Sequence, residues 1–272
     1  MFKKLTAVIT ALIMLFCAIS SFSLSASAKV ENGSLVVLGD SIAEGFGIYN
    51  SDEACYGKIV ADSLGYSYKN YGKNGDRTID LLNKLSDEKI SADVTGADLI
   101  LISIGGNDFL QQNLPVLFFS VMRKDYHHIN NIKNELVKNF ALIIEKVKAL
   151  NHDALIVCQT VYNARTDLFR DFYGIAVDAI NDTICGYLEE HPGAYELVDV
   201  KSAIGKDKEN IAIDTVHPSA VGNETIATAI MYKLYQTGYT DSFETVILKR
   251  GIDRIPFLSY IMRFIHGFFV KV

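Results

Sequence analysis

Residues 97–108 read ADLILISIGGND, and the apolar run inside this stretch decides the fold class. Between Leu99 and Ile104 the only polar residue is Ser103, so apolar side chains stand at both alternating positions. A strand with one face in water alternates apolar and polar residues, whereas a parallel strand covered by helices on both faces is apolar throughout. The run therefore predicts a buried strand in a parallel sheet.

Four further strand-like runs occur along the chain, with helix-like segments between them. One of these segments, residues 131–150, carries apolar residues at the spacing of one helix face. Strands that alternate with helices are typical of successive β-α units. The sequence therefore predicts an α/β fold, a three-layer α/β/α sandwich with a mainly parallel, five-stranded sheet. The other four runs are LVVLGD (35–40), YSYKNYG (66–72), ALIVCQTVYN (154–163) and AYELVDV (194–200).

Residues 1–28 have the features of an export signal. Lys3 and Lys4 precede an apolar stretch, which ends on the small residues of Ala26-Ser27-Ala28. A signal peptidase cuts after such a pattern, so we expect removal of residues 1–28 and a secreted, extracellular or cell-envelope location. A permanent N-terminal anchor is the alternative, but the small residues at the end of the segment argue against it.

The C-terminal residues 241–272 differ in composition from residues 29–240, which we expect to form the main domain. From Ile247 onward this tail carries five basic residues and one Asp, whereas the whole chain has a net charge of −6. Its apolar stretch, residues 255–270, is shorter than the roughly 20 residues that a membrane-spanning helix needs. Two interpretations stay open, peripheral contact with an anionic membrane surface and packing onto the domain as a terminal helix.

The cysteines do not indicate a metal site. Cys55, Cys158 and Cys185 remain after the signal segment, and none has the Cys or Cys/His spacing that holds zinc. Their odd number predicts no disulfide framework, and the apolar run around Cys158 predicts that this thiol is buried. We therefore expect no metal and no organic cofactor, and no nucleic-acid partner.

Small polar residues follow the first three strand-like runs. They are Gly39-Asp40-Ser41, Asn74-Gly75-Asp76 and Gly105-Gly106-Asn107-Asp108. Ligands of parallel α/β sheets bind at the carboxyl ends of the strands, where these groups would meet. A serine at this edge becomes a nucleophile only when a histidine takes its proton and, usually, a carboxylate orients that histidine.

His217 is the histidine best placed for this task. In Asp214-Thr215-Val216-His217-Pro218 a carboxylate precedes it by three residues, close enough in a turn to accept the Nδ1 proton. Pro218 suits the first position of the helix predicted over 219–235 and biases His217 away from helical geometry. The imidazole is therefore expected on a loop that faces the sheet edge. The other histidines are interpreted as surface or capping residues: His127, His128, His152, His191 and His266.

Together these segments resemble the four blocks of the SGNH, or GDSL-type, hydrolase family, in the family's order. The blocks are Gly39–Ile42, Asn70–Gly75, Gly105–Asp108 and Asp214–Pro218. Ile42 replaces the family's Leu, a change in apolar packing rather than in chemistry. The resemblance covers about residues 35–235 and implies the flavodoxin-like SGNH hydrolase fold.

The resemblance also implies the roles of the site residues. Ser41 would be the nucleophile, His217 the general base and acid, and Asp214 the carboxylate that orients His217. The oxyanion hole would consist of the backbone N–H groups of Ser41 and Gly75 and the side-chain amide of Asn107. A neutral amide suits this role because it donates hydrogen bonds without losing a proton.

These observations predict an exported serine esterase that acts through an acyl-enzyme on a lipid, lysophospholipid or O-acylated glycan ester. An acyltransferase that uses the same site, and a non-catalytic protein that binds the cell envelope, are the alternatives. Asp40 and Asp108 are interpreted as loop caps rather than acids. Residues 114–122, LPVLFFSVM, either line or cover an acyl pocket or form a buried helix, and no substrate-binding residue is assigned.

Overall fold

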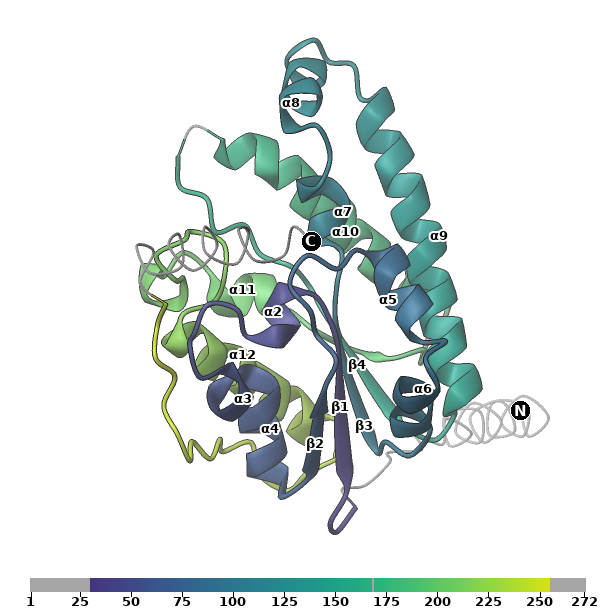
Figure 1. Cartoon of the computed structure of the whole chain (residues 1–272), viewed down its shortest axis with the longest axis vertical. Helices are drawn as coiled ribbons and strands as arrows, with labels where there is room; N and C mark the ends of the chain where they lie inside the picture. The colour runs from purple at the N-terminus through teal and green to yellow at the C-terminus, as the bar shows by residue number, and fades with distance from the viewer. Residues whose placement is uncertain (1–29, 168, 255–272) are drawn as a thin grey trace, which may run out of the picture.

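A parallel sheet of five strands forms the centre of the molecule (Figure 1). The computed structural model describes residues 30–167 and 169–254, so the predicted signal peptide and the tail from residue 255 lie outside the described residues. The strand order is β2-β1-β3-β4-β5, and every neighbouring pair is parallel. The strands are β1 Ser34–Gly39, β2 Ser67–Asn70, β3 Leu99–Ser103, β4 Leu155–Gln159 and β5 Glu196–Val198.

One face of the sheet is covered by a helical layer that contains α9 (His127–Leu150) and α10 (Arg170–Glu190), the two longest helices of the described residues. Val36, Leu38, Ile100 and Ile102 point to this face and pack into one apolar cluster with residues of these helices, among them Ile144. Alternate residues of a strand point to opposite faces, so the same strands supply a second set to the other side. The helices of this layer are α5 Thr78–Lys84, α6 Glu88–Thr95, α9 His127–Leu150 and α10 Arg170–Glu190.

The opposite face carries the second helical layer. Leu35, Val37, Leu99 and Leu101 pack here with helix residues such as Ile226. Burial on both faces explains why the β3 run has no polar face, and it confirms the predicted three-layer α/β/α sandwich. The helices of this layer are α4 Tyr56–Leu64, α11 Val200–Ile204 and α12 Ala220–Gln236.

Short helices such as α7 (Gly106–Leu110) and α8 (Leu114–Met122) lie beyond the carboxyl ends of the strands (Figure 1). The helix α8 lies at one end of the molecule, with Phe119 60% and Met122 68% exposed. The interpretation of residues 114–122 as a buried helix is therefore wrong. Leu117 on the inner side of α8 is only 5% exposed. The short elements are α2 Ser41–Glu44, α3 Ser51–Ala54, α7 Gly106–Leu110, α8 Leu114–Met122 and the 3-10 helix Lys208–Asn210.

The start of α12 differs from the prediction. Pro218 was expected at the first helical position, but Ser219 is the N-cap and its side chain accepts a hydrogen bond from the backbone N–H of Gly222. Pro218 precedes the cap and pairs with Ile211 in an isolated antiparallel bridge. A serine side chain can satisfy a free N–H group of the first turn, which proline cannot do, and this places the cap at Ser219.

The first part of the predicted tail contacts the main domain. The backbone N–H of Val246 donates to Ser63 Oγ, and that of Arg254 donates to the carbonyl of Gly47. Residues 246–254 therefore run along α4 and the loop before α3. They are called the C-terminal strap below. Within the described ranges, no helix is long and apolar enough to cross a membrane.

The packing of α9 against the sheet leads to a stability prediction. Ile144 is fully buried, whereas Leu142 on the same helix is 39% exposed. Ile144→Ala should lower the free energy of unfolding by about 2–5 kcal/mol, since the cavity it leaves closes only in part. Leu142→Ala should change it by about 0.5 kcal/mol or less. Urea unfolding of both variants measures the difference, and equal losses would contradict the described orientation of α9.

Candidate active site

Ser41 lies at the turn between the first strand and the first helix. β1 ends at Gly39, Asp40 caps α2, and Ser41 is the first helical residue. The Asp40 side chain accepts a hydrogen bond from the backbone N–H of Ile42 at 3.0 Å, and its own N–H donates to the carbonyl of Ser103 at 3.1 Å. Neither the N–H nor the hydroxyl of Ser41 is hydrogen-bonded to another described residue, so both can meet a ligand.

His217 and Asp214 form a hydrogen-bonded pair on the loop before α12. His217 Nδ1 lies 2.7 Å from Asp214 Oδ2, as the spacing predicts. The other carboxylate oxygen accepts the backbone N–H groups of Val216 and His217, each at 3.0 Å. Thr215, with φ of +59°, makes the tight turn that folds the carboxylate back under the imidazole.

The hydrogen bonds keep Asp214 ionised. Burial opposes ionisation of this carboxyl group, but the hydrogen bond from His217 and the two backbone donors outweigh it and hold its pKa below the ordinary value. An ionised Asp214 accepts the Nδ1 proton of the neutral imidazole and leaves Nε2 as the nitrogen that can take a proton. The pair therefore has the arrangement of a general base with its orienting carboxylate.

The segment after Ser41 packs directly on the His217 loop. A Cβ atom at Gly47 would lie 1.9 Å from the carbonyl oxygen of Pro218, so only glycine allows this approach. The ring of Phe46 lies against the imidazole of His217, with centroids 4.8 Å apart. The guanidinium of Arg254 from the C-terminal strap also packs on Phe46, 4.2 Å from the ring centroid. His217 thus rests on a ring that the strap also contacts.

A cavity of about 90 Å³ joins the serine and the histidine loop. Ser41 and Asn107 line it together with Thr215 and Val216. Tyr162 also lines it, and its hydroxyl donates to the carbonyl of Val216 at 2.9 Å, which fixes the loop from the side of β4. Much of the remaining wall is apolar, with Phe109, Leu110, Val161, Ala176, Val177 and Ile180, but Asp40, Asn163 and Arg165 also line the cavity.

Asn107 and Gly75, two of the predicted oxyanion donors, differ in their hydrogen bonds and in their position relative to the cavity. The side-chain amide of Asn107 donates one hydrogen to the carbonyl of Asp76 at 3.0 Å, and the second hydrogen stays free for a ligand. Gly75 is not among the residues that line the cavity. Its carbonyl accepts from the side chain of Gln111, and its N–H has no hydrogen-bond partner among the described residues.

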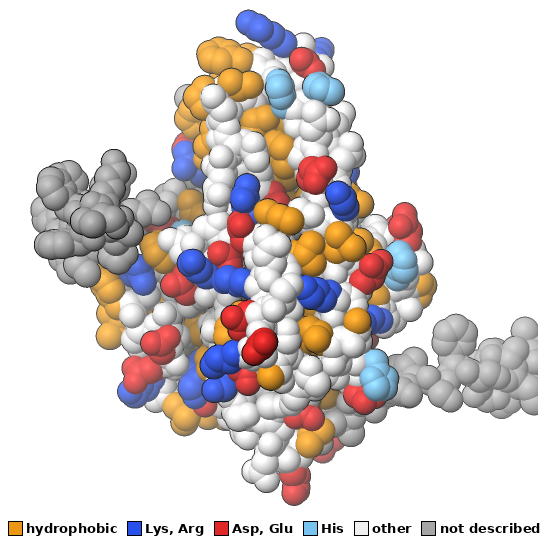
Figure 2. Space-filling view, turned by 45° about the vertical axis from the view of Figure 1, so that its right-hand side comes forward, with side chains coloured by type: hydrophobic (Ala, Val, Ile, Leu, Met, Phe, Trp, Pro, Cys, Tyr) orange, Lys and Arg blue, Asp and Glu red, His pale blue; other side chains and the backbone are white. Residues whose placement is uncertain are grey.

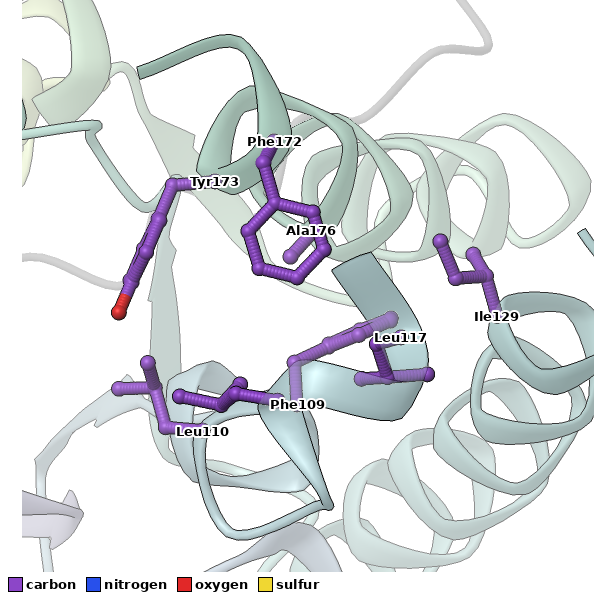
Figure 3. Close-up of a pocket in the computed structure, with 8 residues that line it drawn as sticks. Phe109, Leu110, Leu117, Ile129, Phe172, Tyr173 and Ala176 are labelled. Atoms are coloured by element: carbon purple, nitrogen blue, oxygen red, sulfur yellow. The ribbon is translucent and has the colours of Figure 1, made fainter. Parts of the chain in front are cut away.

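A second, smaller cavity continues the apolar wall toward α8 (Figure 3). It has a volume of about 20 Å³ and shares Phe109, Leu110, Tyr173 and Ala176 with the first cavity. Its lining side chains come from α7, α8, α9 and α10, and Figure 3 shows Leu117 of α8 and Ile129 of α9 across from Tyr173. Apolar side chains that line the Ser41 cavity therefore also line a space beneath α8.

Buried carboxyl groups lie behind the serine. Burial raises the pKa of Asp40 to about 7, with Asp108 and Asp76 adding repulsion, while the hydrogen bond from Ile42 and the nearby His217 oppose the shift. Burial also raises the pKa of Asp108, against hydrogen bonds from the N–H and hydroxyl of Thr78. Both residues cap local structure, as predicted, and neither reaches the reacting atoms by a described hydrogen bond.

Some contacts of the site were missed by the sequence analysis. Tyr162 follows β4, and the rule that directs attention to strand ends applies to this strand as well as to the first three. Phe46 and Arg254 gave no signal, because their contact joins residues far apart in the sequence. Among the described residues, Ser41 Oγ and His217 Nε2 do not form a hydrogen bond in this structure. Cys158 is buried, as predicted.

The order and geometry of these blocks agree with a known family of hydrolases. Residues 37–225 match the GDSL-like lipase/acylhydrolase family. The chain belongs to this family. Its members are carboxylic ester hydrolases of the GDSL, or SGNH, type, and the five-stranded parallel sheet flanked by helices is the fold of their solved structures.

The chain is also similar to individual proteins. The chain is 27% identical to the uncharacterized protein YpmR of Bacillus subtilis strain 168 over 86% of this chain and 97% of the relative. It is 29% identical to the spore germination lipase LipC of Bacillus licheniformis over 62% of this chain and 76% of LipC. The crystal structure of the lipase Lip_vut3 from a goat rumen metagenome aligns with a TM-score of 0.62 and 25% identity, covering 78% of this chain and 99% of that one.

The buried carboxyl of Asp40 leads to a prediction about pH and stability. Its pKa is raised from 3.8 to about 7 on folding, so the folded protein binds more protons than the unfolded one between these values. Ionisation then costs stability as pH rises, by up to about 4 kcal/mol for a shift of this size. Asp40→Asn removes this cost, so its free energy of unfolding relative to wild type should increase from about pH 4 to about pH 7 and then level off.

Urea unfolding at several pH values measures this difference. Asp80→Asn is the control of opposite sign, because hydrogen bonds from Arg77 outweigh burial and lower the pKa of Asp80. Its loss of stability should therefore grow as pH rises through the pKa of the folded state. A difference between Asp40→Asn and wild type that does not change with pH would contradict the burial of an ionisable group behind Ser41.

Proposed function

We propose that this chain is an exported serine esterase that hydrolyses esters of apolar acyl groups through an acyl-enzyme on Ser41. The observation that carries the proposal is the cavity shared by Ser41, Asn107 and the loop of Thr215 and Val216, with the His217–Asp214 pair on the same loop. Export is proposed from the signal-like residues 1–28.

In the first half-reaction, Ser41 Oγ attacks the ester carbonyl carbon while its proton passes to Nε2 of His217. The resulting imidazolium is stabilised by the ionised Asp214, which holds Nδ1 at 2.7 Å. The C–O bond of the ester then breaks, and the leaving alcohol takes the proton from Nε2. A water molecule, activated by the same histidine, attacks the acyl-enzyme and regenerates the Ser41 hydroxyl.

Negative charge develops on the former carbonyl oxygen in both half-reactions. The N–H of Ser41 is at the start of α2, where backbone donors are free and the helix end favours an anion. The free hydrogen of Asn107 Nδ2 gives a second donor, held in place by the hydrogen bond to the carbonyl of Asp76. We assign the third donor to the N–H of Gly75, which is free of described partners.

The apolar wall favours an acyl chain longer than acetyl. The cavity that contains Ser41 and the small cavity beneath α8 share apolar side chains of α7 and α10, and burial of methylene groups is favourable at about 0.8 kcal/mol each. This supports lipid esters over O-acetylated glycans as substrates. LipC and Lip_vut3 are named as lipases, which agrees with this choice.

The nucleophile provides the first test of the proposal. Wild-type protein should react covalently with a fluorophosphonate and hydrolyse a soluble short-chain ester. Ser41→Ala should lose both properties, with an unchanged circular dichroism spectrum, since the hydroxyl carries the covalent step. Residual turnover near the wild-type value would overturn the mechanism. Ester products formed with added alcohols or glycans, in place of free acid, would identify a transferase instead.

The oxyanion donor provides the second test. Asn107→Ala should lower kcat by roughly a hundred- to a thousandfold, the usual effect of losing one donor, with little change in KM. Asn107→Asp is a useful companion, because a carboxylate of the same shape repels the developing charge and should be no better than alanine. Steady-state kinetics on the soluble ester separate the two constants, and an effect on KM alone would assign Asn107 to substrate binding.

A further inference from the structure

The helix α8 has two apolar sides, of which only one is explained by the cavity. Its nine residues, LPVLFFSVM, contain no charged side chain. Leu114 and Leu117 line the small cavity on the inner side. On the outer side, Phe119 is 60% and Met122 68% exposed to solvent. A helix that is apolar all round is normally buried on all sides, so this outer side calls for a contact outside the described chain.

The exposed apolar surface extends from α8 to the start of α10. Phe118 links the two helices, with its ring in edge contact with Phe119, Phe169 and Phe172. Phe169, just before α10, is itself 45% exposed. We call the outward-facing side chains the apolar cap, and Figure 2 shows orange side chains of this kind at the top of the molecule. The apolar cap consists of Val116, Phe119, Met122 and Phe169.

Basic residues follow the apolar cap directly in the sequence. Arg123 and Lys124 are exposed in the turn between α8 and α9, and Figure 2 shows blue side chains beside the orange ones. Asp125 is the acid of this turn, but its carboxylate accepts the backbone N–H of His127 at the start of α9, where the helix dipole offsets its charge. The chain as a whole has a net charge of −6. The cations Arg123 and Lys124 make this turn a local site of attraction for anions on an otherwise acidic protein.

We propose that the apolar cap and the turn of Arg123 and Lys124 dock on the surface of an anionic phospholipid bilayer. The exposed side chains insert among the acyl chains at the interface, while the two cations contact lipid phosphates. The small cavity on the inner side of α8 then lies next to the source of the acyl chains, and it shares Phe109, Leu110 and Tyr173 with the cavity that contains Ser41. Delivery of substrate rests on the proposed esterase function, whereas docking itself does not depend on catalysis.

A tryptophan placed in the apolar cap tests this docking directly. The sequence contains no tryptophan, so Phe119→Trp in the full chain gives one emitter at a known position. Its emission should be that of an exposed indole in buffer and should move to shorter wavelength with phosphatidylglycerol vesicles. The shift should be much smaller with phosphatidylcholine vesicles at the same lipid concentration. Leu248→Trp, at a site 69% exposed in the C-terminal strap and far from α8 in Figure 1, should not shift.

Two sets of variants measure the contributions of the side chains. Phe119→Ser with Met122→Ser should weaken binding to phosphatidylglycerol vesicles by roughly tenfold or more, since two large apolar groups are lost. Arg123→Gln with Lys124→Gln should weaken it by about fivefold per charge removed. None of these side chains lines the cavities, so turnover of a soluble short-chain ester should stay within about twofold of wild type.

The outcomes separate the two proposals. Short-wavelength emission of Phe119→Trp already in buffer would mean that protein covers the apolar cap, from this chain or a second copy, and would overturn the docking. The same holds for an unchanged emission with vesicles, for an equal shift with neutral vesicles, and for a shift of Leu248→Trp in place of Phe119→Trp. If the wild-type protein does not hydrolyse the soluble ester, the esterase function is refuted, whereas the fluorescence result still tests the docking.

Discussion

The approach of Gly47 to the backbone of Pro218 is the contact on which the site depends. Ser41 follows the first strand and His217 lies on the loop before α12, so no local structure sets their relative position. Because a Cβ atom at Gly47 would lie 1.9 Å from the Pro218 carbonyl oxygen, the two segments can meet only at a glycine. The ring of Phe46 then contacts the imidazole, and the guanidinium of Arg254 also packs on this ring. The serine and the loop that carries the histidine, far apart in the sequence, thereby line one cavity.

The same region gathers charges that the interior would otherwise exclude. Asp40, Asp76 and Asp108 lie buried at the carboxyl edge of the sheet, and each is held by a specific donor or cation: the N–H of Ile42, Lys84 and Thr78. Burial raises the pKa of Asp40 in spite of its donor. Such partly compensated groups cost stability, and proteins keep them mostly at functional sites. The arrangement fixes the turn that exposes the Ser41 N–H to a ligand.

The sequence predicts what depends on short-range patterns and on strand ends. The apolar runs identify all five strands, and the Asp214-Thr215-Val216-His217 spacing predicts the 2.7 Å pair, because a turn of that length allows little else. The helix begins two residues later than predicted from Pro218, since both proline and serine favour helix starts and only the structure decides between them. Arg254 could not be predicted, because its contact with Phe46 arises from the course of the C-terminal strap, which no pattern encodes.

The helix α8 marks a further limit of pattern analysis, because an all-apolar stretch is compatible with burial on every side. Only the fold shows that one side closes the cavity and the other faces solvent. A polar residue at position 119 or 122 would leave the cavity lining unchanged, so the cavity gives no reason for Phe119 and Met122. Exposed apolar side chains gain no hydrophobic stabilisation in water, and a gathered patch of them favours association. The proposed contact with a lipid surface gives these residues a physical reason, on the outer side of the helix whose inner side lines an apolar cavity.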